Sequence, residues 1–328
     1  MRRRGTSRRG TPAVALAVAL AALGAGCGGS DAPESVGSPQ PRTTTGAQRP
    51  PAQGTVLAAV AALPGGRYLT GELTSGIVRE QRTGPVLARL ALATGGQRGL
   101  LGLAAAPDGR TIWASYTAAD GGRLVVERLR PSPRRRVWTG PVGTALATGG
   151  HLLYDDARDV LLIGVGDLQD PSKVTDPDAP NGKLLALDPD GPADQAPVVL
   201  SLGWNNPFAF ARTPGGTVWV VDNAPGERPE RIARGTTGGG PPDRVTELRG
   251  TTAASGVVAL GERTLAVCGV VSGRLDRYDY ETDTAIWRRG GVLDDDCRYG
   301  VTQLTDGRLA VSGARGIHVI DRPGGPTP

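Results

Sequence analysis

The sequence predicts an all-β fold, a six-bladed β-propeller, and two observations lead to this prediction. The chain of 328 residues contains 50 glycines and 27 prolines, a composition that favours tight turns and short strands over long helices. In addition, a pair of strands recurs six times, at intervals that run from 43 residues (Arg67 to Arg110) to 58 residues (Asp159 to Thr217). A strand-only repeat of this length is typical of a propeller blade.

Each repeat begins with a tight turn, continues with an apolar strand and ends, after a second turn, with a more charged strand. The six copies are GGRYLTGELTSGIVRE from Gly65, DGRTIWASYTAADGGRLVVERL from Asp108, RDVLLIGVGD from Arg158 with GKLLALD from Gly182, GGTVWVVDN from Gly215, ERTLAVCGVVSGRLDRYD from Glu262 and DGRLAVSGARGIHVID from Asp306. Each repeat has room for about four strands. A β-sandwich or a β-solenoid is the alternative, but sandwiches seldom repeat so regularly and solenoid coils are usually shorter.

The two ends of the ring must be joined, because an open propeller would leave an exposed sheet edge. We expect residues 54–62, which include VLAAV, to supply a strand that closes the ring against the last blade. The propeller is therefore predicted to span residues 54–322, and residues 323–328 are expected to be a disordered tail.

The N-terminal region is expected to direct export. Residues 1–26 combine a basic stretch with an apolar run too short to span a bilayer, as in a signal peptide. Cys27 follows small residues, as in lipoprotein signals whose cysteine becomes lipidated, although Gly24 stands where such signals usually have leucine. We expect a lipoprotein at the cell surface or the extracytoplasmic face of the membrane, with simple secretion as the alternative. Residues 27–53 are rich in Gly, Ser, Pro and Thr and are predicted to be a disordered tether.

Charge and cysteine content narrow the range of partners. The net charge of +5 equals the five arginines among the first nine residues, so the rest of the chain is close to neutral and a nucleic-acid partner is not expected. Membrane contact is expected only through the lipid anchor, and the protein is expected to be a monomer. In an oxidising compartment Cys268 and Cys297 could form a disulfide. Two separately buried thiols are the alternative.

Few motifs in the chain point directly to chemistry. The sequence contains no P-loop, no dinucleotide fingerprint after a strand, no HExxH and no cysteine pair at zinc spacing. Of its two histidines, His318 lies in an apolar strand pattern and is expected to be structural, whereas His151 follows two glycines at the start of a strand and is the candidate catalytic residue. The polar insert 167–182 lengthens one repeat, and long loops on a rigid scaffold often carry function.

Segments in order along nearly the whole domain resemble the glucose/sorbosone dehydrogenase family of six-bladed propellers, which includes enzymes that use pyrroloquinoline quinone (PQQ) and calcium. The segments that carry the resemblance are LPGGRYLTGELTSGIV, GQRGLLGLAAAPDG, GGHLLYDDARDVLLIGVGD, NGKLLALDPDG, GWNNPFAF, VVDNAPGERPERI, SGVVALGERTLAVCGVVSGRLDRYD and TDGRLAVSG. The resemblance implies a PQQ- and calcium-dependent oxidoreductase that acts on the CH–OH groups of sugars.

The resemblance also assigns site residues. Gln97 matches the family glutamine that touches the quinone, and Asn206 with Pro207 keeps an Asn-Pro step. The main-chain carbonyls of Ala224 and Pro225 match positions that could hold calcium.

Other family positions are changed. Asn205 replaces the quinone-binding arginine, Arg298 alone stands for a late arginine pair, and Ala147 takes the place of the catalytic histidine, four residues before His151. Because PQQ carries three carboxylates, a pocket with fewer cations offsets their desolvation poorly.

Three functions therefore remain open from the sequence. The first is an enzyme that oxidises a sugar, with Gln97, His151 and Asn206 at the cavity mouth. The second is a non-catalytic cell-surface propeller that binds a glycan or a protein through the same face, including Trp204 and the insert 167–182. A metal-dependent hydrolase with Asp167, Asp222 and Asn223 near the axis is a third possibility.

Overall fold

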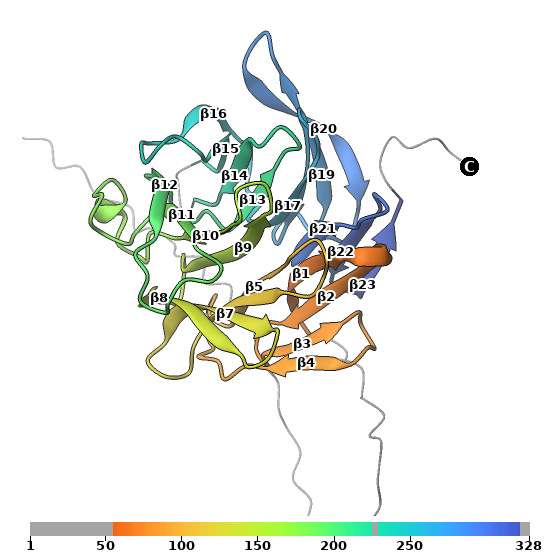
Figure 1. Ribbon diagram of the computed structural model, residues 1–328. Coiled ribbons are helices and arrows are strands. Elements are labelled where there is room, and N and C mark those ends of the chain that lie inside the picture. The colour runs from red at the N-terminus through yellow and green to blue at the C-terminus, as the bar shows by residue number, and fades with distance from the viewer. Residues whose placement is uncertain (1–54, 225–228, 322–328) are drawn as a thin grey trace, which may run out of the picture. The chain divides into compact units, whose positions relative to one another are not determined.

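The computed structural model describes residues 55–224 and 229–321 and confirms the all-β, six-bladed propeller (Figure 1). Helical structure is limited there to two single turns, η1 (Pro64–Gly66) and η2 (Pro171–Lys173). Within these two ranges no helix has the length and apolar character needed to cross a membrane. The expected signal peptide, Cys27, the tether, Pro225 and the tail lie outside the described residues.

Each blade is an antiparallel sheet formed by a contiguous stretch of chain. The first three blades comprise β1 (Leu57–Leu63), β2 (Arg67–Glu72), β3 (Ile77–Glu80), β4 (Val86–Arg89); β5 (Leu100–Ala105), β6 (Ile112–Thr117), β7 (Arg123–Arg130), β8 (Arg135–Val142); β9 (Gly149–Asp155), β10 (Val160–Val165), β11 (Lys183–Leu187), β12 (Val198–Leu202). The last three comprise β13 (Ala209–Arg212), β14 (Val218–Asp222), β15 (Arg231–Arg234), β16 (Asp243–Glu247); β17 (Ala254–Gly261), β18 (Thr264–Gly269), β19 (Leu275–Glu281), β20 (Ile286–Asp294); β21 (Gly300–Gln303), β22 (Leu309–Gly313), β23 (Gly316–Ile320).

The apolar core is distributed around the ring instead of being gathered at one centre. A cluster of buried residues lies between each pair of neighbouring blades, as with Leu101 and Trp113 of the second blade against Leu161 and Ile163 of the third. The second and third strands of the blades coincide with the sequence repeats, which explains their regular apolar pattern. Each Å² of apolar surface buried between blades contributes about 25 cal/mol. This burial therefore stabilises both the individual blades and the ring.

The ring closes differently from the sequence-based expectation. The N-terminal strand β1 pairs with β2 as the innermost strand of the first blade, and the sheet of the last blade consists of β21, β22 and β23 only. The expected closing strand therefore forms, but it hydrogen-bonds within the first blade and does not join the sheet of the last blade. Instead β1 packs beside β21 and β22, where Leu57 joins an apolar cluster with Leu304 and Ile317, and the Ser312 hydroxyl donates to the Leu57 carbonyl at 2.9 Å.

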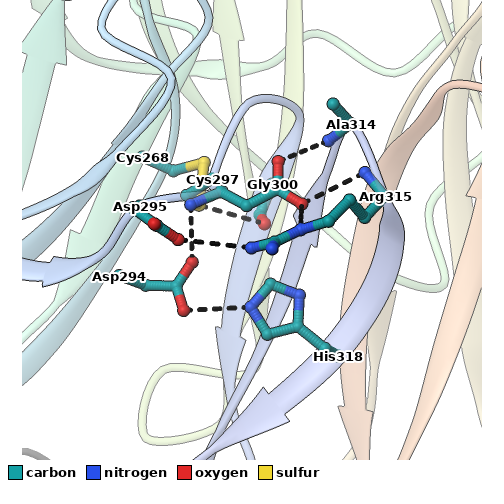
Figure 2. A network of polar contacts seen from close by, with 9 residues as sticks. Cys268, Asp294, Asp295, Cys297, Gly300, Ala314, Arg315 and His318 are labelled. Atoms are coloured by element: carbon teal, nitrogen blue, oxygen red, sulfur yellow. Dashed lines mark hydrogen bonds and ion pairs between the residues drawn. A yellow bond between two sulfur atoms is a disulfide. The ribbon is translucent and has the colours of Figure 1, made fainter.

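A covalent bond and a polar network tie the three-stranded last blade to the fifth. A disulfide joins Cys268 of β18 to Cys297 in the connection to β21, with the two Cα atoms 5.2 Å apart. Figure 2 shows the disulfide together with Ala314 and Arg315. The Asp296 carboxylate accepts from the main-chain N–H groups of these two residues and from the Arg315 side chain. Burial raises the pKa of Asp296, but these hydrogen bonds outweigh it and hold the pKa below its usual value.

Removal of the disulfide is predicted to weaken this joint. The bond closes a loop of 29 residues, and a chain-entropy estimate for such a loop gives about 3.5 kcal/mol. The Cys268→Ala/Cys297→Ala variant should therefore lose roughly 2–4 kcal/mol of unfolding free energy in a denaturant titration. A reducing agent should lower the midpoint of the unmodified protein but leave that of the double variant unchanged; equal midpoints for the two proteins would contradict the assignment.

Candidate functional site

The candidate site lies at the end of the propeller where the outer strand of one blade connects to the inner strand of the next. We call this end the loop face. It is formed by the interblade connections 90–99, 143–148, 203–208, 248–253 and 295–299 and by the described residues of the turns between the second and third strands of the blades. Gln97, Ala147, Asn205 and Asn206 all lie in these connections, and Asp222 lies at the end of β14 on the same face.

Asp222 holds the connection between the third and fourth blades. Its fully buried carboxylate accepts from the main-chain N–H groups of Asn205 and Asn206 at 2.8–3.1 Å and from the Asn205 side-chain amide at 3.0 Å. The Arg231 side chain donates to the same carboxylate and to the Gly203 carbonyl, and its guanidinium carbon lies 5.3 Å from the centre of the Trp204 ring. The Asn205 amide and the Arg231 guanidinium are thus both engaged within the protein.

Asn206 holds the first residue of β9, and Gln97 holds the segment that precedes this strand. The Asn206 side-chain oxygen accepts from the Gly149 N–H at 3.0 Å, and the Gln97 side-chain oxygen accepts from the Ala147 N–H at 2.7 Å. Ala147 is 4% exposed and has a φ of +53°, a left-handed conformation that costs an alanine roughly 1–2 kcal/mol.

The insert 167–182 folds onto the loop face through main-chain contacts. The Asp167 N–H donates to the Asn205 carbonyl at 2.6 Å, and the Asn181 side chain donates to the Asp167 carbonyl at 2.7 Å. Beneath it the Lys183 ammonium group, on a residue only 1% exposed, donates to the carbonyls of Val174 and Asn181. Burial lowers the pKa of Lys183, and the nearby Asp176 acts in the opposite direction. Nothing in GKLLALD distinguishes this buried lysine from an exposed one.

Two other predicted residues, Arg298 and Trp204, have contacts within the protein. Arg298 lies in the connection between the fifth and sixth blades and donates to the Val270 carbonyl at 3.2 Å. Trp204 is fully buried and donates through its indole nitrogen to the Ser201 hydroxyl, so the expectation that it contacts a ligand is wrong.

The acidic and amide residues considered for a metal site have protein partners. The Asp222 carboxylate accepts from Asn205, Asn206 and Arg231, and the Asn223 amide donates to the Ala254 carbonyl, while its own oxygen is buried without a hydrogen-bond partner. Across residues 55–224 and 229–321, no group of three or more His, Cys, Asp or Glu side chains is arranged to hold a metal ion. Ala224 is buried beside this region.

The two histidines lie in different places. His318 lies on β23 and contacts the Asp294 carboxylate at 3.0 Å (Figure 2). His151 lies on β9 and lines the propeller axis, with its ring edge-on to Phe210 at a centroid distance of 4.7 Å. Burial lowers the pKa of His151 to about 4, so the imidazole is neutral at pH 7.

Comparison with known proteins identifies the family. Residues 56–238, more than half of the chain, match the family described as Glucose / Sorbosone dehydrogenase, and the protein therefore belongs to it. No curated protein matches the sequence.

Solved structures share the fold. A putative oxidoreductase (glucose dehydrogenase) from Thermus thermophilus is 25% identical, with a TM-score of 0.65 over 79% of this chain and 91% of that one. The apo form of the soluble aldose sugar dehydrogenase from Escherichia coli is 20% identical, with a TM-score of 0.67 over 81% and 96% of the two chains. The PQQ-bound aldose sugar dehydrogenase from Streptomyces coelicolor is 20% identical, with a TM-score of 0.63 over 86% and 94%.

The neutral state of His151 leads to a prediction for the pH dependence of stability. Because its folded pKa lies below the unfolded value of about 6.5, the unfolded state binds a proton first as the pH falls, and stability should decrease by roughly 2–3 kcal/mol between pH 7 and pH 4 from this residue alone. NMR titration of the two imidazoles measures the pKa directly. The His151→Gln variant should have a flatter stability profile over this interval, whereas a His151 pKa near 6.5 would contradict the prediction.

Proposed function

We propose that this family member binds a carbohydrate ligand at its loop face and does not oxidise it through PQQ. The observation that carries the proposal is that side chains of the loop face bind other parts of the protein or lack the group that the family's chemistry needs. Asn205 stands at the family position of the quinone-binding arginine, and its amide is bound to Asp222. Ala147 stands at the position of the catalytic histidine and has no side-chain group that accepts a proton.

The small number of arginines that could bind the carboxylates of the quinone also supports the proposal. The quinone has three carboxylates, which require cationic or N–H partners once they leave water. Arg231 is paired with Asp222, whereas Arg298 donates to a neutral main-chain carbonyl of the fifth blade and keeps its charge. The loss of a general base alone typically costs a factor of about a hundred to ten thousand in rate. These residues therefore do not fit the family's quinone, and we derive no reaction step through it.

A sugar remains the expected class of ligand because the related structures include sugar dehydrogenases. The exposed Gln97 and the polar insert 167–182 supply amide and carboxylate groups that can hydrogen-bond to hydroxyls. Oxidation of a sugar CH–OH group is the second candidate function, and it is favoured by family membership and by the retained Gln97 and Asn206.

We also propose that the protein is exported and anchored to the membrane through a lipid at Cys27. The disulfide between Cys268 and Cys297 supports export, because disulfides persist in oxidising compartments and are rare in reducing ones.

Calorimetric titration of the full chain with PQQ, with and without calcium, separates the two candidate functions. The proposal predicts no binding tighter than about 10 µM, which corresponds to roughly 7 kcal/mol. The Streptomyces coelicolor enzyme, whose PQQ-bound structure is known, is the positive control. Calcium-dependent binding of PQQ by this protein below that concentration would overturn the proposal and favour the dehydrogenase.

A further inference from the structure

A cavity of about 250 Å³ lies on the propeller axis, away from the loop face. Its wall consists of short segments of the six inner strands, namely 60–62, 103–105, 151–154, 210–212, 257–259 and 301–303. These segments extend toward the end of the propeller opposite the loop face, which we call the far face, because each inner strand starts at the loop face. The volume approaches that of small-molecule sites, which begin at roughly 300 Å³.

The cavity narrows sharply toward the loop face. At this narrow level the axial space is about 10 Å³, room for about one water molecule, and it is bordered by His151, Gly102, Gly256 and Gly300. A Cβ atom added at Gly256 would lie 2.8 Å from the Val301 nitrogen, so the inner strands approach one another closely here. A ligand larger than water would therefore enter from the far face and stop at His151.

The wall of the cavity is rich in hydrogen-bonding groups but carries little net charge. Each inner strand pairs with a neighbour on one side only, so its other edge presents unpaired main-chain N–H and C=O groups toward the axis. Thr302 and Gln303 add a hydroxyl and an amide. Arg212 is the one formally charged residue among the described residues that line the cavity, and the buried Asp155 carboxylate lies 3.0 Å from it.

Aromatic rings complete the wall on one side. His151 and Phe210 lie edge to face at the inner end, and Tyr154, stacked on Trp113 at 5.0 Å, lies nearer the far face. The Tyr154 hydroxyl donates to the Asp159 carboxylate, which fixes the ring. Apolar rings beside alternating donors and acceptors suit a compact molecule with several hydroxyl groups and C–H faces.

We propose that this axial cavity is a binding site for a small, uncharged polyhydroxylated molecule, entered from the far face and closed by His151. The site is separate from the loop face and does not depend on the function proposed there. His151 contributes polar ring atoms at the closed end, and the strand edges bind the hydroxyls. Because Arg212 is paired with Asp155, its charge gives the cavity mouth no strong preference for anions.

NMR titration with D-glucose and with glycerol tests the site, because the chain has only two histidines and each can be assigned by substitution. Saturable shifts of the His151 imidazole and of the Phe210 and Gln303 signals, with His318 unchanged, are expected at a Kd of about 1 mM or lower for at least one probe. The absence of saturable shifts at these three residues with both probes would overturn the proposal.

Matched variants distinguish this site from the loop face. His151→Phe keeps a ring against Phe210 but removes the polar atoms, and it should weaken binding at least tenfold, whereas His318→Phe should not change it. Asn206→Ala, which alters the loop face, should leave the shifts of Gln303 unchanged. Binding that is lost in Asn206→Ala but kept in His151→Phe would assign the probe to the loop face and overturn the axial site.

Discussion

The structure depends on the joint that closes a ring of separate blades. Each blade is formed by a contiguous segment, and β1 stays in the first blade, so no strand is shared across the closure. Packing of Leu57 against Leu304 and Ile317 must hold the first blade to the last. The disulfide and the Asp296 contacts hold the last blade to the fifth (Figure 2). A three-stranded blade buries less surface than a four-stranded one, which gives these contacts their importance.

The same need to join blades governs the loop face. Asp222 and Gln97 accept main-chain N–H groups from a neighbouring connection, and Asn206 accepts one from the first residue of β9. These contacts fix the second, third and fourth blades relative to one another. Buried N–H groups need such partners, since an unsatisfied one costs about 1–3 kcal/mol. A site built in this way keeps the architecture of the dehydrogenase family while its side chains bind the protein itself. Family membership is therefore compatible with the proposed carbohydrate binding without PQQ turnover.

The sequence predicted the parts of the molecule that repeat or that follow a family order. The six blades followed from the apolar strand of each repeat. The family order singled out Gln97 and Ala147, but it did not predict the hydrogen bond that joins them. Features set by three-dimensional packing were not predictable in this way. VLAAV suits an inner strand of either end blade, and neither the burial of Trp204 nor that of Lys183 leaves a local signal. The axial cavity is formed by six distant segments and has no sequence pattern of its own.

The central claim is that loop-face side chains already hold the segment before β9 in the protein alone. Amide hydrogen exchange at Ala147 and Gly149, followed without any added cofactor, tests it most directly. The account predicts slow exchange at both amides in the unliganded protein, with faster exchange at Ala147 in Gln97→Ala and at Gly149 in Asn206→Ala. Rapid exchange at both amides that becomes slow only after PQQ and calcium are added would contradict it, because these side chains would then be free to bind a cofactor.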